Sequence, residues 1–128
     1  MNALITQNIK ITVESMYKSE YSKPDKQYYI FAYKITIENK GEHTIQLMTR
    51  HWEIFDSVGE RKKVDGRGVI GQQPILKPGE KYQYVSGCNL KSDLGCMEGH
   101  YNMLNHVTQE MLTIPIPKFN LIANYRLN

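Results

Sequence analysis

The chain of 128 residues is 41% hydrophobic and 23% charged, which is the balance of an ordinary globular protein with one core. Its formal net charge of +3 is too small to indicate nucleic-acid binding, and no apolar run is long enough to span a bilayer. The first residues lack the basic start and apolar run of a signal peptide. We therefore expect a single cytoplasmic domain over residues 1–128, without a nucleic-acid or membrane partner.

Short strands are predicted from the amino terminus onward. Ile9, Ile11 and Val13 alternate with polar residues, a period of two that is typical of a strand with one buried face. Residues 28–39 form the strongest predicted strand, and its length and β-branched content favour a central position in a sheet. The side chains expected on its apolar face are Tyr29, Phe31, Tyr33, Ile35 and Ile37.

The next predicted strand, residues 45–55, changes its alternation partway along. Its apolar residues stand at odd positions as far as Leu47 and at even positions from Trp52. A β-bulge near Thr49 and Arg50 would bring both halves onto one face. Trp52, the only tryptophan, is expected to pack across the core, as in immunoglobulin-like sandwiches.

The second half of the chain continues in short strands separated by turns. A hairpin turn at 56–59 is followed by a short returning strand at 61–64, and further strands are predicted at 81–90 and 97–104. Two closing strands, 110–114 and 119–123, are expected to be separate because Pro115 and Pro117 cannot lie inside a paired central strand. The sequence thus predicts an all-β fold, an antiparallel immunoglobulin- or fibronectin type III-like β-sandwich of seven to nine strands.

Residues 64–78, here called the glycine segment, contain the densest glycine spacing in the chain. Gly66, Gly68 and Gly71 match the Gly-x-Gly-x-x-Gly pattern of dinucleotide-binding folds, but that pattern must open a helix, and Pro74 and Pro78 prevent one. Two interpretations remain. The glycines either allow positive φ in a long connection, or they form a nest of backbone N–H groups that binds phosphate oxygens.

In the second interpretation, charged side chains complete the site. Arg67, assisted by Arg61, Lys62 or Lys63, would add charge-assisted hydrogen bonds to a phosphate-bearing small molecule. The candidate ligand-binding residues are Gly66, Arg67, Gly68, Gly71, Arg61 and Lys63.

Metal binding and catalysis are disfavoured. His51, Cys88, Cys96 and His100 can be drawn as a zinc set, but they lack the paired knuckle of a structural zinc site, and the cysteines are expected as free thiols. Cys96 and His100 have no orienting third group for nucleophilic catalysis. A further hypothesis, a metal-dependent hydrolase of nucleotide polyphosphates, is disfavoured because the carboxylates are scattered along the sequence. We expect no enzyme, no catalytic residue, no metal and no cofactor.

Several motifs taken together resemble those of the ApaG family. They cover nearly the whole chain from about residue 9 onward, and their combination is specific although each piece alone is not. The motifs are Tyr29-x-Phe31-Ala32-Tyr33, Trp52-x-Ile54-x-Asp56, Val64-x-Gly66-x-Gly68-Val69-x-Gly71-x-Gln73-Pro74, Tyr84-x-Ser86-Gly87, Leu94-Gly95-x-Met97-x-Gly99-x-Tyr101 and Ile114-Pro115-x-Pro117-x-Phe119.

The resemblance implies a fibronectin type III-like sandwich in a family with no established enzymatic activity. It implies a link to cobalt and magnesium resistance or efflux, and binding of pyrophosphate or a nucleotide-like anion at Gly66, Gly68 and Gly71. A similar domain in certain eukaryotic F-box proteins implies an interaction module. The leading hypothesis is therefore a non-enzymatic binding module for a phosphate-bearing small molecule. The alternative is a protein–protein interaction domain whose glycine segment is purely structural, with a homodimer as a further expectation.

Overall fold

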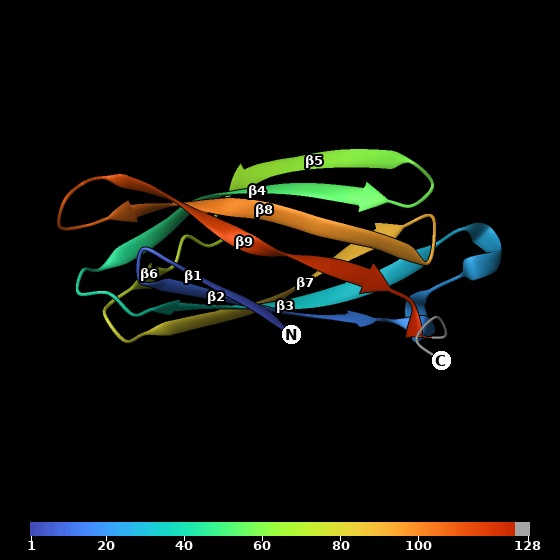
Figure 1. Cartoon of the computed structure of the whole chain (residues 1–128), viewed down its shortest axis with the longest axis horizontal. Coiled ribbons are helices and arrows are strands. Elements are labelled where there is room, and N and C mark those ends of the chain that lie inside the picture. The colour runs from blue at the N-terminus through green and yellow to red at the C-terminus, as the bar shows by residue number, and fades with distance from the viewer. Residues whose placement is uncertain (125–128) are drawn as a thin grey trace.

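The computed structural model describes residues 1–124, which form two antiparallel β-sheets packed face to face (Figure 1). Two short 3-10 turns, Ser19–Tyr21 and Pro24–Lys26, lie in the connection after the second strand. No helix within residues 1–124 has the length and apolarity that a membrane crossing requires. The strands are β1 (Asn2–Thr6), β2 (Ile9–Tyr17), β3 (Tyr29–Asn39), β4 (Ile45–Asp56), β5 (Glu60–Arg67), β6 (Ile75–Leu76), β7 (Lys81–Leu90), β8 (Leu94–Asn105) and β9 (Met111–Ile122).

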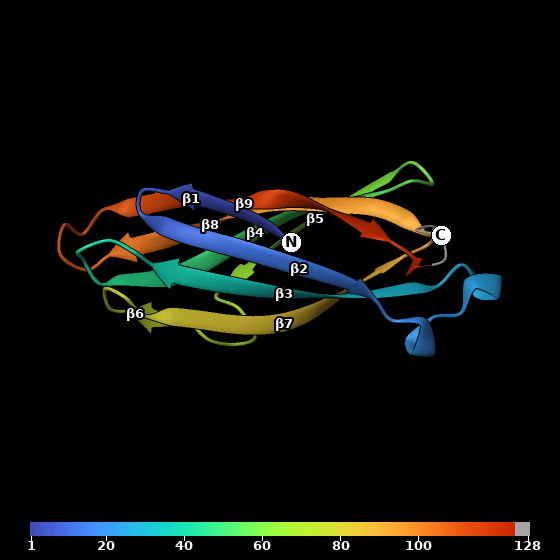
Figure 2. The ribbon, with the colours of Figure 1, turned by 60° about the horizontal axis from the view of Figure 1, so that its bottom comes forward.

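The order of the strands gives the sandwich one closed side and one open side. The first sheet runs β1-β2-β3-β7, and the second runs β5-β4-β8-β9, with β6 also paired to β4. On one side, β1 and β2 contact β9 across the two layers. On the opposite side, which we call the open side, the sheets end in β5 and β7. Figure 2 shows β7 at the margin of its sheet, with β3 paired on its inner side. This architecture confirms the predicted fold class.

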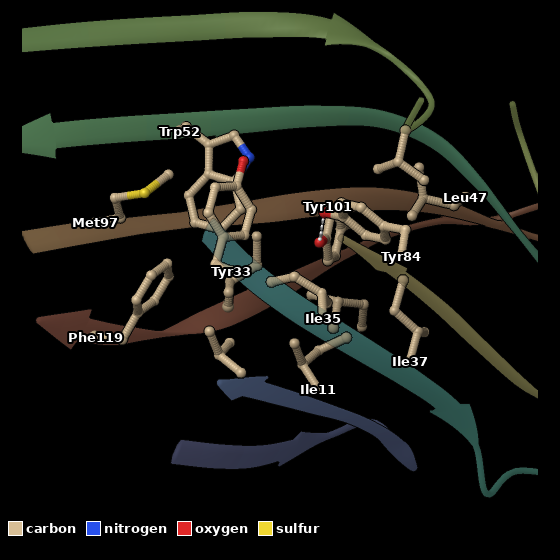
Figure 3. Packing of buried hydrophobic residues seen from close by; sticks show 14 of the residues in the cluster. Ile11, Tyr33, Ile35, Ile37, Leu47, Trp52, Tyr84, Met97, Tyr101 and Phe119 are labelled. Carbon is tan, nitrogen blue, oxygen red and sulfur yellow. Dashed lines mark hydrogen bonds between the residues drawn. The ribbon is translucent and has the colours of Figure 1, made fainter. Parts of the chain in front are cut away.

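The core follows from the alternation in β3 and β4. The predicted face of β3 is buried from Phe31 to Ile37, while Tyr29 at its start is half-buried. The predicted bulge in β4 is confirmed, since the register with β8 shifts between Leu47 and Thr49. Trp52 is 2% exposed and packs edge-on against Tyr33, with ring centroids 5.4 Å apart (Figure 3).

Two strand predictions differ from the structure, and two strands were not predicted. The expected pair of closing strands is a single strand, β9, which tolerates Pro115 and Pro117 because it is the last strand of its sheet and its register with β8 shifts beside them. The returning strand is longer than expected, because β5 continues to Arg67. The sequence also gave no prediction of β1 or of the two-residue β6.

Candidate functional site

The glycine segment folds into a strand end followed by a tight hairpin. Gly66 and Arg67 belong to β5, and a two-residue turn at Ile70 and Gly71 follows, both with positive φ (48° and 72°). Reciprocal backbone hydrogen bonds between Val69 and Gln72, at 2.8 and 2.9 Å, close this turn. Positive φ at both central positions is the pattern of a type I′ hairpin, which glycine and asparagine favour.

Three backbone amides of this segment donate to carbonyls of the same chain. The N–H of Gly68 donates to the Met48 carbonyl at 2.8 Å, and those of Val69 and Gln72 form the hairpin pair. These three donors therefore do not converge on a shared hollow, which favours the structural interpretation of the glycines. Anion binding by the segment stays a prediction.

Arg50 explains why Gly66 is a glycine. Its guanidinium donates through Nη1 to the carbonyls of Arg67 (3.1 Å) and Gly68 (2.9 Å). A Cβ atom on Gly66 would lie 2.6 Å from this guanidinium, so a larger residue there would displace the guanidinium from these hydrogen bonds. Sequence reasoning missed this role of Arg50. The signal was present, because the predicted bulge puts Arg50 on the same inward face as Trp52.

The predicted cations are not gathered at one point. Arg67 and Gly66 line a shallow hollow on the outer face of the second sheet, while Arg61 and Lys63 line a separate hollow farther along β5. The guanidinium of Arg61 lies over the ring of Phe55, 5.0 Å from its centroid. Gly68 is buried, and Gly71 lies exposed at the hairpin tip. The six predicted site residues are thus spread over four places.

The outer face beside Arg67 carries an imidazole–carboxylate pair. His51 Nδ1 lies 2.6 Å from Asp65 Oδ1, and the His51 ring stacks on His100 with centroids 5.0 Å apart. The hydrogen bond that His51 donates to the Asp65 carboxylate raises the pKa of His51, with a smaller contribution from Glu53, whose carboxylate lies 3.6 Å from Nε2. No group of three or more potential ligands within residues 1–124 is arranged to hold a metal ion.

The two cysteines do not join these histidines. Cys88 lies in β7 on the inward side of the open edge, whereas Cys96 pairs with Phe55 in the second sheet. Both are free thiols. Burial raises the pKa of Cys88 to about 11, which disfavours the thiolate that nucleophilic chemistry requires. The structure therefore separates the residues of the hypothetical zinc set.

The four outermost strands differ in how they are protected against pairing with another chain. Exposed edges in natural proteins are usually shortened, charged, bulged or interrupted by proline. By these criteria β1 is short, β9 contains two prolines, and six of the eight residues of β5 are charged. In contrast, β7 has ten residues with one charge, at Lys81, and an unbroken register with β3. Among the described strands, β7 is therefore the long unprotected edge.

The register shows which backbone groups of β7 point outward. The N–H of Asn39 donates to the Glu80 carbonyl at 3.0 Å, and the N–H of Gly79 donates to the Asn39 carbonyl at 2.8 Å. Bonded and non-bonded pairs alternate along an antiparallel ladder, so the even-numbered residues of β7 bond to β3. The N–H and C=O groups of residues 81, 83, 85, 87 and 89 therefore point away from the sheet.

A groove of about 260 Å³ lies between β7 and the inner face of β4 and β5. Trp52, Tyr33 and Met97 contribute apolar surface, and Val64 stands 37% exposed at the β5 side. Two cations, Arg50 and Lys62, also line it. No carboxylate within residues 1–124 does so.

Comparisons with known proteins agree with the fold. The family profile described as the ApaG domain matches residues 19–105. The chain is 44% identical to Protein ApaG of Parvibaculum lavamentivorans over 94% of this chain and 92% of that protein. It is 41% identical to Protein ApaG of Pectobacterium atrosepticum, over 87% and 88% of the two chains. Among solved structures, an ApaA protein from Bordetella pertussis matches with a TM-score of 0.87 at 39% identity, over 91% of this chain and 94% of that chain. None of these names assigns a reaction.

Proposed function

This chain belongs to the ApaG family, and from that premise we propose that it is a non-catalytic binding domain that captures an extended segment of a partner protein along β7. The proposal takes up the alternative in which the glycine segment is structural. One observation carries it: β7 presents the outward N–H and C=O groups of five residues with a single charge, at Lys81, whereas the other edges are short, densely charged or interrupted by proline. Strand addition to an open sheet edge is a common mode of peptide recognition.

Charge favours a different protein over a second copy of this chain. Pairing of two copies through β7 would bring their β5 strands near each other, and each β5 carries four cations against two carboxylates. Like charges in such proximity oppose association. A partner segment without this positive charge meets no such opposition. The expected homodimer is therefore treated as an outcome of the test.

Strand addition to β7 can be tested by comparing changes at two similarly exposed valines. Val85 in β7 is 57% exposed, and Val107 in the β8–β9 turn is 63% exposed. Val85→Pro removes one outward N–H, a change that an edge strand tolerates, and Val85→Lys adds a protecting charge. Cytosolic partners are cross-linked from a photoreactive residue at position 85 or 107. We expect capture from position 85 alone, and its loss when a neighbouring β7 residue, Gln83, is changed to proline.

Amide hydrogen exchange of the captured complex then shows whether the partner pairs with the backbone of β7. We expect slowed exchange at Gln83, Val85 and Gly87, whose N–H groups pair with the partner strand. Unchanged exchange at these residues would overturn the proposal. So would a dimer in sedimentation that Val85→Lys converts to monomer while Val107→Lys does not, because the edge would then be occupied by a second copy.

Anion binding at the glycine segment remains a separate prediction with its own measurement. The occupied amides of Gly68, Val69 and Gln72 reduce the donors available there, and Arg67 remains the exposed cation beside them. Calorimetric titration with pyrophosphate and with diadenosine polyphosphates should compare the natural protein with Arg67→Ala, since Gly68 variants would perturb folding. Heat that disappears in Arg67→Ala would support the prediction. The implied link to cobalt and magnesium resistance likewise stays a prediction.

A further inference from the structure

We infer that the segment captured along β7 carries an acidic residue, an apolar residue and a second acidic residue at alternating positions, with these three side chains directed into the β5–β7 groove. This inference rests on the proposed function and specifies the chemistry of the partner. It follows from the charges in the groove, from their spacing along the strands, and from the volume available.

The charges in the groove lack counter-ions. Arg50 donates to two neutral carbonyls, and none of the ion pairs among the described residues includes Arg50 or Lys62. The titratable groups of opposite kind that face the groove are Tyr33 and Cys88. Burial raises the pKa of both, so both remain neutral at physiological pH. Neither cation is therefore in an ion pair within the described residues. Two carboxylates, Glu53 and Glu98, lie with Lys62 in the separate hollow farther along β5 and not in the groove.

The cations stand on either side of an apolar position. On the inner face of the second sheet, Lys62 is opposite Ile54, Val64 is opposite Trp52, and Gly66 is opposite Arg50. Each step of two residues along a strand spans roughly 7 Å, so the order along the groove is cation, apolar surface, cation. A strand added to β7 faces the same row, and its side chains alternate between the two faces of the sheet. Acidic, apolar and acidic residues at every second position match that order.

The volume of the groove favours side chains over a small molecule. Typical small-molecule pockets measure about 300 to 1,000 Å³ and enclose their ligand. The groove, at about 260 Å³, lies below this range and opens toward the unpaired side of β7. Val64, which is partly exposed, lies beside buried Trp52 and provides an apolar surface on which one aliphatic side chain can pack.

The test uses labelled seven-residue peptides and fluorescence anisotropy. The first peptide has a central valine with a glutamate two positions away on each side, and threonine elsewhere. The second replaces both glutamates with lysine. The third moves each glutamate next to the valine, which turns the carboxylates to the opposite face of an added strand. We expect the first peptide to bind at least about tenfold more tightly than either of the others, given the usual worth of partly exposed charge pairs.

A matched pair of lysines separates groove recognition from general attraction. Lys62 is opposite Ile54 and lines both the groove and the separate hollow farther along β5, whereas its neighbour Lys63 lines that hollow and not the groove. Lys62→Glu should weaken the first peptide about tenfold or more, and Lys63→Glu should change it little. Equal effects of the two variants, equal binding of the first and third peptides, or no binding of the first would overturn the inference.

Val85→Pro then distinguishes this inference from the proposed function. Loss of the first peptide in Val85→Pro supports both. Binding that persists in Val85→Pro yet still depends on Lys62 overturns strand addition and retains acidic recognition by the groove. A partner complex with slowed exchange along β7 but no dependence on Lys62 overturns the acidic pattern alone.

Discussion

The two strands that border the open side, β5 and β7, are built in opposite ways. Six of the eight residues of β5 are charged, and the glycine segment, which begins within β5, is held to the sheet by hydrogen bonds from Arg50 and by those of the hairpin. In contrast, β7 is regular, nearly uncharged and bonded to one neighbour only. Three backbone amides of the glycine segment are therefore already hydrogen-bonded within the chain. The outward backbone groups of β7, whose sequence carries no glycine motif, are available to a partner. In this protein, the segment with the most recognisable sequence motif is not the segment with free backbone hydrogen-bonding groups.

The largest expected effect comes from placing a valine at a glycine in each region, at Gly68 in the glycine segment and at Gly87 in β7. A Cβ on Gly68 would lie 2.0 Å from the Gln72 carbonyl oxygen, and its φ of 58° strains any L-residue. We expect Gly68→Val to lower the free energy of unfolding by about 3 kcal/mol or more, from left-handed backbone and overpacking together. A Cβ on Gly87 in β7 meets ordinary contact at 3.5 Å, so Gly87→Val should stay within about 1 kcal/mol. Urea denaturation measures both, and equal losses would contradict the contrast.

A second prediction concerns the hydrogen bonds from Arg50 to the carbonyls of Arg67 and Gly68. Arg50→Gln removes two hydrogen bonds from a charged donor, and we expect a loss of about 2 kcal/mol. Arg67→Gln, at an exposed position, is the control and should cost less than about 0.5 kcal/mol. Gly66→Ala displaces the guanidinium, so Arg50→Gln should cost less in that background than alone. Additive losses in the double-mutant cycle would show that Gly66 and Arg50 act independently.

Local alternation was enough to predict the sandwich but not its edges. The apolar faces of β3 and the bulge in β4 follow from period-two patterns that each strand carries by itself. Which strand ends a sheet depends on long-range pairing, so the sequence predicts a break at the prolines of β9, whereas in the structure they lie in a single edge strand. The partnership of Arg50 with Gly66 has the same origin. This contact depends on the register between β4 and β5, which the glycine motif does not contain. The motif taken alone therefore predicts a ligand.

A third prediction concerns backbone strain at the hairpin tip. Ile70 is a β-branched residue with φ of 48° and 60% exposure, a combination that sequence preferences oppose. Ile70→Asn would place asparagine before Gly71, the pair preferred in type I′ turns. We expect the free energy of unfolding to rise by about 1 kcal/mol, the usual scale of left-handed strain. The same substitution at Val107, which is exposed without such strain, should have little effect. A destabilised Ile70→Asn would mean that the isoleucine makes a compensating contact.

The smallest expected effect concerns the charges that cover β5, and it depends on pH. Asp65 raises the pKa of His51 above its ordinary 6.5, so this pair stabilises the folded state fully below pH 6.5 and loses that contribution as pH rises through the folded pKa. Relative to Asp65→Asn, the natural protein should therefore lose stability as pH rises from about 6.5 through the raised pKa of His51. Denaturation midpoints at several pH values measure this, and Val85→Thr in β7 should follow the natural profile because no titrating group is changed. Parallel profiles for Asp65→Asn and the natural protein would mean that water screens the pair completely, leaving β5 protected by repulsion among its cations and not by paired charge.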